Sequence, residues 1–402
     1  MKAIRLGVVF DQEIHSGGGY QQALNAALLV RELPANVAEV TFFSTLQKNI
    51  PALASHGIKA KLLSFSFFEK LRNYLRRQIT TARLLGLVEN IERFSPFEKI
   101  LVNHQIDLVY FLSPSISARS LEMLNYITTV WDLCHRDDPE FPEVRWSRNF
   151  EARDQTYMAI LPRAVAIFVD SEVGKKNTAR RYGVDQERIH ILPFQAAEAT
   201  QREVDCSIDP SEKYKLDLPY VFYPAQFWAH KNHVYLLQGL RLLEDQYGKR
   251  VGAIFSGGDM GCRAYIERFA NNLGLKDRIR FIGFVSNEEI VALYRHSIAL
   301  VMPSYFGPTN LPPLEAFQLG VPVLYSDKHG LRDQVGDAAL LMDLKNPQSM
   351  AIHLKNLIED EHLAKRLIAA GYERLKFFDS YDRVGLLQKV IEDFSWRRLC
   401  WE

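Results

Sequence analysis

The chain has 402 residues, of which 47% are hydrophobic and 24% charged, and its formal net charge is +1. This length accommodates two domains, and the near-neutral charge argues against a nucleic-acid partner. No apolar run approaches the length of a membrane span and the N-terminus does not read as a signal peptide, so we expect a cytoplasmic protein. Four scattered cysteines without a CxxC pair fit a reducing compartment and offer no metal site: Cys134, Cys206, Cys262 and Cys400.

Short apolar runs alternate with helical stretches from end to end, which predicts βαβ units and parallel sheets. One sheet of so many strands would strain an open twisted sheet. We therefore predict an α/β protein with two Rossmann-like domains that face a central cleft, with ligands at the carboxyl ends of the strands. The predicted strands cover residues 4–10, 40–44, 108–112, 129–133, 166–170, 220–223, 253–256, 279–282 and 299–302.

The predicted boundaries follow from this pattern. Residues 1–195 form the first domain, and residues 196–218, which are polar and carry little helical or strand pattern, form the linker. Residues 219–375 form the second domain. Residues 376–402 form a C-terminal helix that crosses back to the first domain, where it would also cover its two tryptophans.

A glycine-rich loop follows the first predicted strand: His15, Ser16, Gly17, Gly18 and Gly19 precede a helix predicted at 20–33. Glycines here let the backbone approach a ligand closely. The spacing is not the GxGxxG fingerprint, so NAD is not indicated. A plain loop is the alternative, but the first strand–helix turn of such a domain favours Gly18 and Gly19 as residues that line the cleft.

The stretch 57–100 carries nine basic and four acidic residues, a local charge of +5. Within 65–83, aromatic and leucine side chains interleave with Lys and Arg. One interpretation is a helix with its apolar face in the core and its charges in water. The other is a peripheral contact of 65–83 with an anionic membrane, which would place the protein on the inner face of the plasma membrane.

Two further polar positions fall at predicted strand ends. Asp132 and His135 follow the strand at 129–133, and this position favours a functional role over that of a structural histidine. Lys231, followed by Asn232, lies between the strand at 220–223 and the next helix. The start of a helix favours phosphate, so a phosphate contact is favoured over a surface lysine.

The stretch 303–327 reads as loop, helix and strand, directly after the strand at 299–302. Pro312 and Pro313 suit the start of a helix, predicted at 314–319, since the first turn does not use their missing N–H groups. Free N–H groups and the helix dipole there would attract phosphate. Glu315 could accept two hydroxyl hydrogen bonds from a ribose, each worth about 1.5–3 kcal/mol, or it could only complement the positive end of its helix.

This stretch resembles the signature of the retaining glycosyltransferase family 4, which has the GT-B fold. The matching residues are Leu-Pro-Pro-Leu-Glu-Ala at 311–316, Gly-Val-Pro-Val at 320–323 and Ser-Asp at 326–327. The loop 306–310, Phe-Gly-Pro-Thr-Asn, resembles a sub-group of bacterial polysaccharide and O-antigen glycosyltransferases. The resemblance covers most of the chain and is most specific over 220–343.

The resemblance implies roles in donor binding. In the family, an arginine and a lysine five residues apart hold the diphosphate; here the lysine is Lys231 and the arginine position is Gln226. The family's first glutamate, which is associated with the donor sugar, is Gly307 here. Thr309 and Asn310 could supply the missing hydrogen bonds.

The resemblance also implies that the helix start at Leu311 stabilises the departing diphosphate and that Glu315 holds the ribose. The loop with Gly18 and Gly19 would contact the donor phosphates or the acceptor. The histidine that many family members place near the donor sugar is Trp131 here, whereas His135 matches the sub-group. We therefore expect His135 to be catalytic, with Asp132 orienting it or the acceptor.

Together these residues predict a retaining glycosyltransferase that moves a hexose-like sugar from a nucleoside diphosphate sugar to a saccharide or lipid-linked saccharide in surface polysaccharide biosynthesis. No protein nucleophile, cofactor or metal is expected. A sugar-nucleotide epimerase on the same fold is disfavoured because that class lacks the Leu-Pro-Pro-Leu-Glu-Ala helix start. A degenerate nucleotide-binding partner subunit is the alternative, since Gly307, Gln226 and Trp131 depart from the family pattern.

Overall fold

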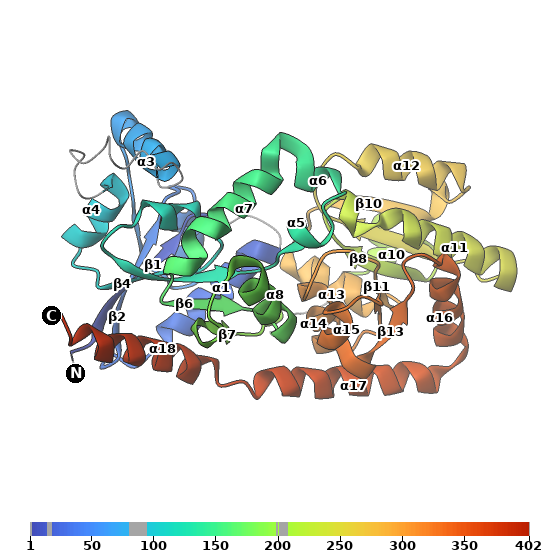
Figure 1. The fold of residues 1–402 in the computed structure, drawn as a ribbon. Coiled ribbons are helices and arrows are strands. Elements are labelled where there is room, and N and C mark those ends of the chain that lie inside the picture. Colours follow the sequence, from blue (N-terminus) through green and yellow to red (C-terminus); the bar gives the residue numbers. More distant parts are fainter. Residues whose placement is uncertain (1, 14–17, 80–94, 198–199, 201–207, 402) are drawn as a thin grey trace. The chain divides into compact units, whose positions relative to one another are not determined.

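The computed structural model describes residues 2–13, 18–79, 95–197, 200 and 208–401 (Figure 1). Two compact units make up the chain. The first comprises residues 1–137, 147–193 and 381–402, and the second comprises residues 138–146 and 194–380. The predicted loop residues His15, Ser16 and Gly17, together with Arg83 of the basic stretch, lie outside the described residues.

The first unit is built on a sheet of parallel strands in the order β3-β2-β1-β4-β5-β6-β7. β1 runs beside both β2 and β4, which pairs Leu6 with Val40 and with Leu108. The strands are β1 (Ile4–Phe10), β2 (Ala38–Ser44), β3 (Ala60–Leu62), β4 (Leu108–Phe111), β5 (Asn125–Val130), β6 (Ala166–Val169) and β7 (Ile189–Ile191).

Helices surround this sheet, and apolar clusters fill the space between (Figure 1). A helix such as α8 shows how the sequence sets the bounds: the Ser171 hydroxyl accepts a hydrogen bond from the Gly174 N–H, and Gly183 ends the helix in a left-handed conformation. The helices are α1 (Gly18–Arg31), α2 (Asn49–Ser55), α3 (Phe67–Ile79), α4 (Pro96–Asn103), α5 (Cys134–Asp137), α7 (Asn149–Ile160), α8 (Glu172–Tyr182) and α18 (Arg383–Arg398).

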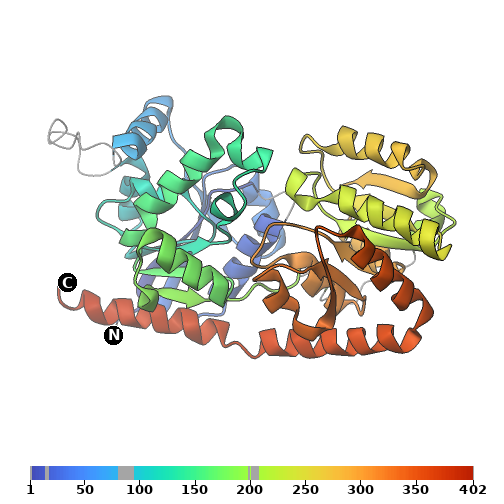
Figure 2. The same cartoon turned by 45° about the vertical axis from the view of Figure 1, so that its right-hand side comes forward.

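The second unit has its own parallel sheet, in the order β10-β9-β8-β11-β12-β13. Figure 2 shows helices on both faces of this sheet. Burial on both faces explains why these strands are short continuous apolar runs rather than alternating ones. The strands are β8 (Tyr220–Pro224), β9 (Gly252–Ser256), β10 (Ile279–Gly283), β11 (Leu300–Met302), β12 (Val323–Ser326) and β13 (Ala339–Met342).

The helices of the second unit pack around one continuous apolar cluster. They are α6 (Pro142–Arg145), α10 (Pro210–Tyr214), α11 (His233–Tyr247), α12 (Arg263–Asn272), α13 (Asn287–Arg295), α14 (Leu311–Gln318), α15 (Leu331–Val335), α16 (Pro347–Glu359) and α17 (Glu361–Asp379). The prediction of two parallel sheets in place of one large sheet is confirmed.

Several predicted bounds are wrong in detail. The strand predicted at 129–133 is β5, which ends at Val130. Leu133 is buried, but it lies in the loop that follows this strand. The helix predicted at 314–319 begins three residues earlier, at Leu311. The predicted linker 196–218 contains α10, and β3, β7 and β13 were not predicted. Burial of an apolar residue does not itself distinguish a strand from a loop, which accounts for the first error.

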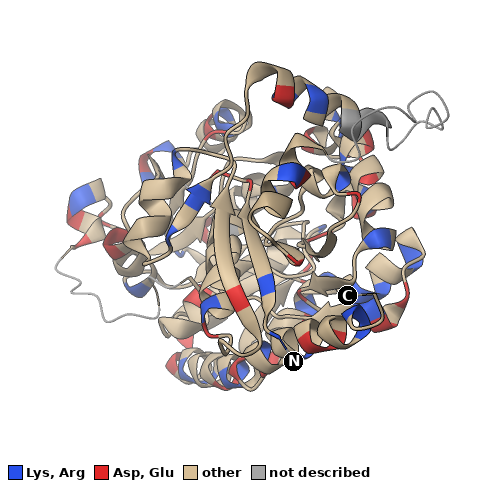
Figure 3. Ribbon diagram, turned by 90° about the vertical axis from the view of Figure 1, so that its left-hand side faces the viewer, with Lys and Arg blue, Asp and Glu red and all other residues tan. Residues whose placement is uncertain are grey.

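The C-terminal helix α18 belongs to the first unit, where Leu387, Ile391 and Phe394 join the cluster beside β1. The packing of α18 does not cover the tryptophans of the C-terminal segment: Trp396 in this helix is 61% exposed, and Trp401 beyond its end is 56% exposed. Residues 138–146 lie within the predicted first domain in sequence but pack with the second unit. Figure 3 shows basic and acidic residues interspersed over the helices.

In the helix α3, most large apolar side chains are exposed, which bears on the two interpretations of residues 65–83. Its Asn73 is buried and accepts a hydrogen bond from the Phe97 N–H at 3.1 Å. Its large apolar side chains face outward instead, with Phe67 76% and Phe68 74% exposed. The prediction that the apolar face of this segment lies in the core is therefore wrong for the described residues.

Candidate functional site

The turn that carries Lys231 follows β8 directly. A 3-10 helix, Ala229–Lys231, leads through Asn232, which is left-handed (φ 54°), into α11. The Tyr223 hydroxyl donates to the Lys231 carbonyl oxygen at 3.0 Å. A contact from the strand itself thus fixes the lysine backbone at the carboxyl end of the sheet, where ligands of such folds bind.

Gln226 lies in the same strand-end loop as Lys231. Its side-chain oxygen accepts a hydrogen bond from the Trp228 indole N–H at 3.0 Å. The amide therefore orients an aromatic side chain, and it cannot supply the positive charge of an arginine at this position. Lys231 is the cationic member of the predicted pair.

The start of α14 offers fewer backbone donors than the sequence suggested. Asn310 is the N-cap, and its N–H donates to the Gln334 side chain at 2.9 Å. Pro312 and Pro313 have no N–H group. The prediction of several free N–H groups is wrong in this respect, since Leu311 supplies the remaining backbone N–H of this turn.

The Asn310 side chain is hydrogen-bonded to other groups of the protein. Its amide donates to the Phe306 carbonyl oxygen at 3.0 Å and to the Tyr325 hydroxyl at 2.7 Å. Gln334 returns a bond to the Asn310 carbonyl oxygen at 2.6 Å. Asn310 thus shapes the loop 306–310, whereas Thr309 next to it is half-buried.

Gly307, where the resemblance predicts a glutamate to be replaced, lies close against a neighbouring side chain. A Cβ atom there would lie 2.4 Å from Leu331 Cδ2 and 3.1 Å from Leu331 Cγ. Leu331 itself is 1% exposed and begins α15. The substituted loop is therefore a packed unit in which α15 fills the space that a glutamate side chain would need.

Glu315 lies one turn into α14, where its Oε2 accepts a hydrogen bond from the Tyr294 hydroxyl at 2.8 Å. Burial raises the pKa of this carboxyl, and the Tyr294 bond only partly offsets that effect. A half-buried carboxylate held by a neutral donor gains from further hydroxyl donors. This setting suits a diol such as that of ribose.

The turn with Lys231 and the loop 306–310 meet at one residue that sequence reasoning missed. The His230 carbonyl oxygen accepts a hydrogen bond from the Tyr305 N–H at 2.9 Å. The His230 ring also stacks on Phe306, with ring centroids 3.9 Å apart and an interplanar angle of 6°. The structure thus brings the Lys231 turn and the start of the loop 306–310 together, and the position of His230 next to Lys231 was the available signal.

In the first unit, Asp132 pairs with Arg153 of α7. The Arg153 guanidinium donates to Asp132 Oδ1 at 2.7 Å and to the Asp132 carbonyl oxygen at 2.8 Å. Burial would raise the pKa of Asp132, but the charge of Arg153 and the Cys134 N–H outweigh it and lower that pKa. Asp132 is therefore an ionised acceptor within an ion pair.

His135 lies in the core of the first unit and is 1% exposed. Its Nε2 lies 3.2 Å from the Tyr182 hydroxyl, which donates to Asp154 at 2.9 Å. Asp154 also accepts two bonds from Arg136, at 2.5 and 2.9 Å. Burial, with the charge of Arg153 second, lowers the pKa of His135 to about 4, so the ring is neutral at pH 7.

Because the Tyr182 hydroxyl donates to Asp154, His135 Nε2 carries the proton and donates to Tyr182. His135 Nδ1 is then a bare acceptor that has no hydrogen-bond partner among the described residues. The ring is surrounded by Phe150 and Tyr157, with ring centroids at 5.6 and 5.8 Å. These contacts favour a supporting role for His135.

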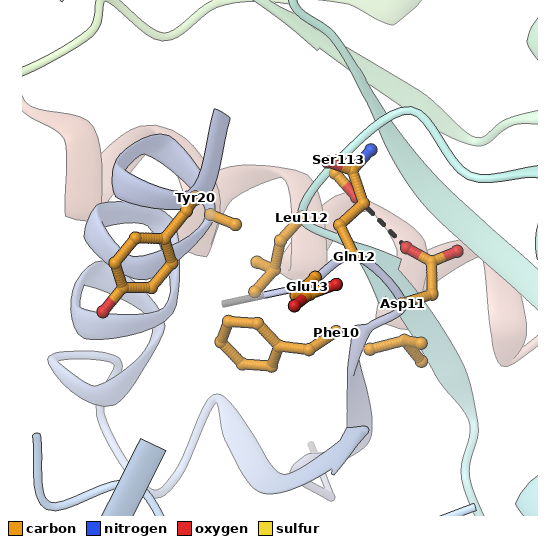
Figure 4. Close-up of a pocket in the computed structure, with 9 residues that line it drawn as sticks. Phe10, Asp11, Gln12, Glu13, Tyr20, Leu112 and Ser113 are labelled. Carbon is orange, nitrogen blue, oxygen red and sulfur yellow. Dashed lines mark hydrogen bonds between the residues drawn. The ribbon is translucent and has the colours of Figure 1, made fainter. Parts of the chain in front are cut away.

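Gly19 brings α1 against Trp131. A Cβ atom on Gly19 would lie 2.7 Å from Trp131 Cζ3, so only glycine allows this approach. Figure 4 shows the adjoining pocket, in which Ser113 donates to Asp11 Oδ1 at 3.1 Å. Sequence reasoning missed Asp11, although it is the first polar residue after β1. The pocket is lined by Val9, Phe10, Asp11, Gln12, Glu13, Tyr20, Ala23, Leu112 and Ser113.

The described residues hold neither a cluster of metal-ligating side chains nor a membrane-spanning helix. No set of three or more His, Cys, Asp or Glu side chains lies close enough to hold a metal ion. Within the same residues, no helix is both long and apolar enough to cross a bilayer.

Residues 207–374 match the sequence family described as Glycosyl transferases group 1. The O-antigen chain mannosyltransferase B of Escherichia coli is 28% identical over 204 residues, which are 48% of this chain and 54% of that protein. The D-inositol 3-phosphate glycosyltransferase of Corynebacterium glutamicum is 26% identical over 270 residues, which are 64% of this chain and 63% of that protein. The chain thus spans between half and two thirds of these relatives.

The Anabaena protein Alr3699/HepE, solved in complex with UDP-glucose, superimposes with a TM-score of 0.68 at 16% identity, over 97% of this chain and 99% of that one. Residues 207–374 are thus similar to a glycosyl transferases group 1 domain, and the chain has the GT-B fold. The predicted fold class is confirmed.

Proposed function

We propose that this protein is a retaining glycosyltransferase of family 4, which transfers a sugar from a nucleoside diphosphate sugar to a saccharide or lipid-linked saccharide in surface polysaccharide biosynthesis. The observation that carries the proposal is the joining of the Lys231 turn to the loop that opens α14, within the matched domain. The same domain offers a cation, a helix start and a half-buried carboxylate, which suit diphosphate and ribose.

The leaving diphosphate sets the main chemical demand, because negative charge grows on it as the glycosidic bond breaks. Lys231 would neutralise part of that charge, and the Leu311 N–H with the dipole of α14 would add a fixed positive potential. Glu315 would accept the ribose hydroxyls. Thr309 would contact the donor next to Asn310, which holds the loop in place.

The first unit would supply the acceptor side. Gly18 and Gly19 would bring the backbone of α1 close to the substrates, and Asp11 offers a carboxylate acceptor to a sugar hydroxyl in the pocket of Figure 4. We assign Asp132 to orienting the acceptor and His135 to supporting Asp132 and α7. No side chain of this chain is assigned as a nucleophile, and transfer is expected to proceed unchanged in EDTA.

A catalytically degenerate nucleotide-binding subunit is the second candidate. Gln226 favours it, because the cation expected at this position is absent and its side chain is bonded to Trp228. The two candidates differ in turnover. Release of free nucleoside diphosphate from a panel of UDP-, GDP-, dTDP- and CDP-sugars, measured with and without a saccharide extract, tests them: slow donor hydrolysis or transfer supports the enzyme, and binding without any release supports the subunit.

We also propose that α3 contacts an anionic membrane surface, which would bring the enzyme to lipid-linked acceptors. Its outward face carries Phe67, Phe68 and Tyr74 beside Lys70 and Arg72, a combination that suits the interface of an anionic bilayer. Flotation with phosphatidylglycerol vesicles tests this contact. Binding should be lost in the Phe67→Ser/Phe68→Ser variant and retained in Phe284→Ser, which alters an exposed phenylalanine of the second unit; a wild type that fails to float contradicts it.

A further inference from the structure

Residues 138–146, here called the strap, lie between α5 and α7 in sequence but belong to the second unit. Two ion pairs fasten them there. Lys328 donates to Asp138 at 2.5 Å and to the Tyr305 carbonyl oxygen at 2.7 Å. Glu143, in the short helix α6, pairs with His230 at 2.5 Å. The strap therefore touches both loops of the candidate donor site.

The Glu143 carboxylate holds His230 by its side chain and by its backbone. Its Oε1 accepts the His230 N–H at 3.0 Å and lies 2.5 Å from His230 Nδ1. Burial would raise the pKa of Glu143, but its bonds with His230 outweigh that effect and lower it, so the carboxylate is ionised and Nδ1 donates. Both side chains are about nine-tenths buried, at 9% and 10% exposure.

The remaining groups of His230 are also occupied. Its carbonyl oxygen accepts the Tyr305 N–H, and its ring stacks on Phe306. Phe141 of the strap lies edge-on to Phe306, with centroids 5.4 Å apart and an interplanar angle of 88°. The strap thus fixes His230 from one side while the loop 306–310 holds it from the other.

Lys231 follows His230 directly, so its backbone position depends on these contacts. We infer that Glu143 is a positioning residue that, through His230, sets the Lys231 turn against the loop 306–310. This inference rests on the proposed donor site. The strap follows α5, which carries His135, and precedes α7, whose Arg153 pairs with Asp132. According to this inference, the strap also completes the phosphate-binding side of the second unit.

Amide hydrogen exchange and nucleotide calorimetry on the full chain test the inference together. In Glu143→Ala, exchange over 226–233 and 303–311 should rise by about ten-fold, and affinity for the nucleoside diphosphate that the wild type binds should fall by about ten-fold. Glu143→Gln keeps an oxygen that can accept both bonds, so it should stay within about three-fold of wild type. Glu140→Ala removes an exposed carboxylate of the same strap and is the matched control.

The outcomes separate this inference from the proposed function. Suppose that exchange is faster in both loops of Glu143→Ala but that the wild-type protein binds no nucleotide. This result supports the positioning role of Glu143 and contradicts the donor site. Unchanged exchange in both loops overturns the positioning role, whatever the wild type binds. Faster exchange throughout the second unit also overturns it, because Glu143 would then support the fold in general.

Discussion

Asp132 and Asp154 of the first unit each pair with an arginine, whereas Glu315 of the second unit accepts a hydrogen bond from a neutral tyrosine hydroxyl. The first arrangement satisfies its charges within the protein. The second leaves a half-buried carboxylate whose pKa is raised because it is partly removed from water. Two groups of residues that look equally polar in sequence therefore differ in how well the protein itself balances the charge of their carboxylates.

This contrast indicates which carboxylate would gain more from binding a ligand. A compensated ion pair gains little from a new partner, since the partner must replace bonds that already exist. A carboxylate held by one neutral donor gains directly from ligand hydroxyls. The charges near Asp132 and His135 are thus largely paired within the protein, and the sparser group around Lys231 and Glu315 is the better candidate for the donor site.

The largest expected effect concerns the network of the first unit. Replacing Asp154 by Ala leaves Arg136 and the Tyr182 hydroxyl without their acceptor, which should lower the free energy of unfolding by about 3 kcal/mol. Urea denaturation measures this change. Glu151→Ala removes an exposed carboxylate from the same helix and should stay within about 0.5 kcal/mol of wild type; equal stabilities of the two variants would break the contrast.

The next effect concerns the loop of the second unit. Gly307→Glu introduces the carboxylate that the proposed family would have here, but its side chain meets Leu331, so we expect a loss of about 1–3 kcal/mol in the free energy of unfolding. Adding Leu331→Ala should relieve the clash, so the double variant should lose less than the two single changes together. A stable Gly307→Glu protein with faster sugar transfer would show that the site lacks only this carboxylate.

A smaller effect follows from the raised pKa of Glu315. Ribose hydroxyls donate to the ionised carboxylate, so nucleotide affinity should fall as the pH drops through that pKa, by about ten-fold at most. Calorimetry between about pH 7.5 and about pH 5, a range that extends toward the ordinary carboxyl pKa, measures it. Glu315→Gln controls for protonation of the nucleotide itself, and an identical pH profile in both proteins would remove Glu315 from the ribose site.

Much of the fold followed from the sequence because buried parallel strands are short apolar runs bounded by turns. The bounds of β1 were predicted to the residue, and the two-sheet division followed from the number of runs. The edge strand β3 was missed since Ala60–Leu62 is short and partly exposed. β5 was displaced because the apolar pattern continues to Leu133 beyond the last paired residue.

The site was less predictable, since its chemistry depends on contacts between distant segments. The sequence indicated Lys231 and Glu315 through their place after strands and at a helix start. It could not show that Leu331 fills the space beside Gly307, that Gln334 takes the Asn310 N–H, or that Glu143 reaches His230. Partners far apart in sequence leave no local pattern.

The Lys231 turn is proposed to bind the diphosphate of a sugar nucleotide. Calorimetric titration of UDP, GDP, dTDP and CDP into the wild type, Lys231→Ala and the exposed-lysine control Lys276→Ala tests it most directly. We expect one nucleotide to bind, Lys231→Ala to weaken it by about ten-fold, or about 1.4 kcal/mol, and the control to bind like wild type. Equal affinity in all three proteins, or no binding to the wild type, would contradict the claim.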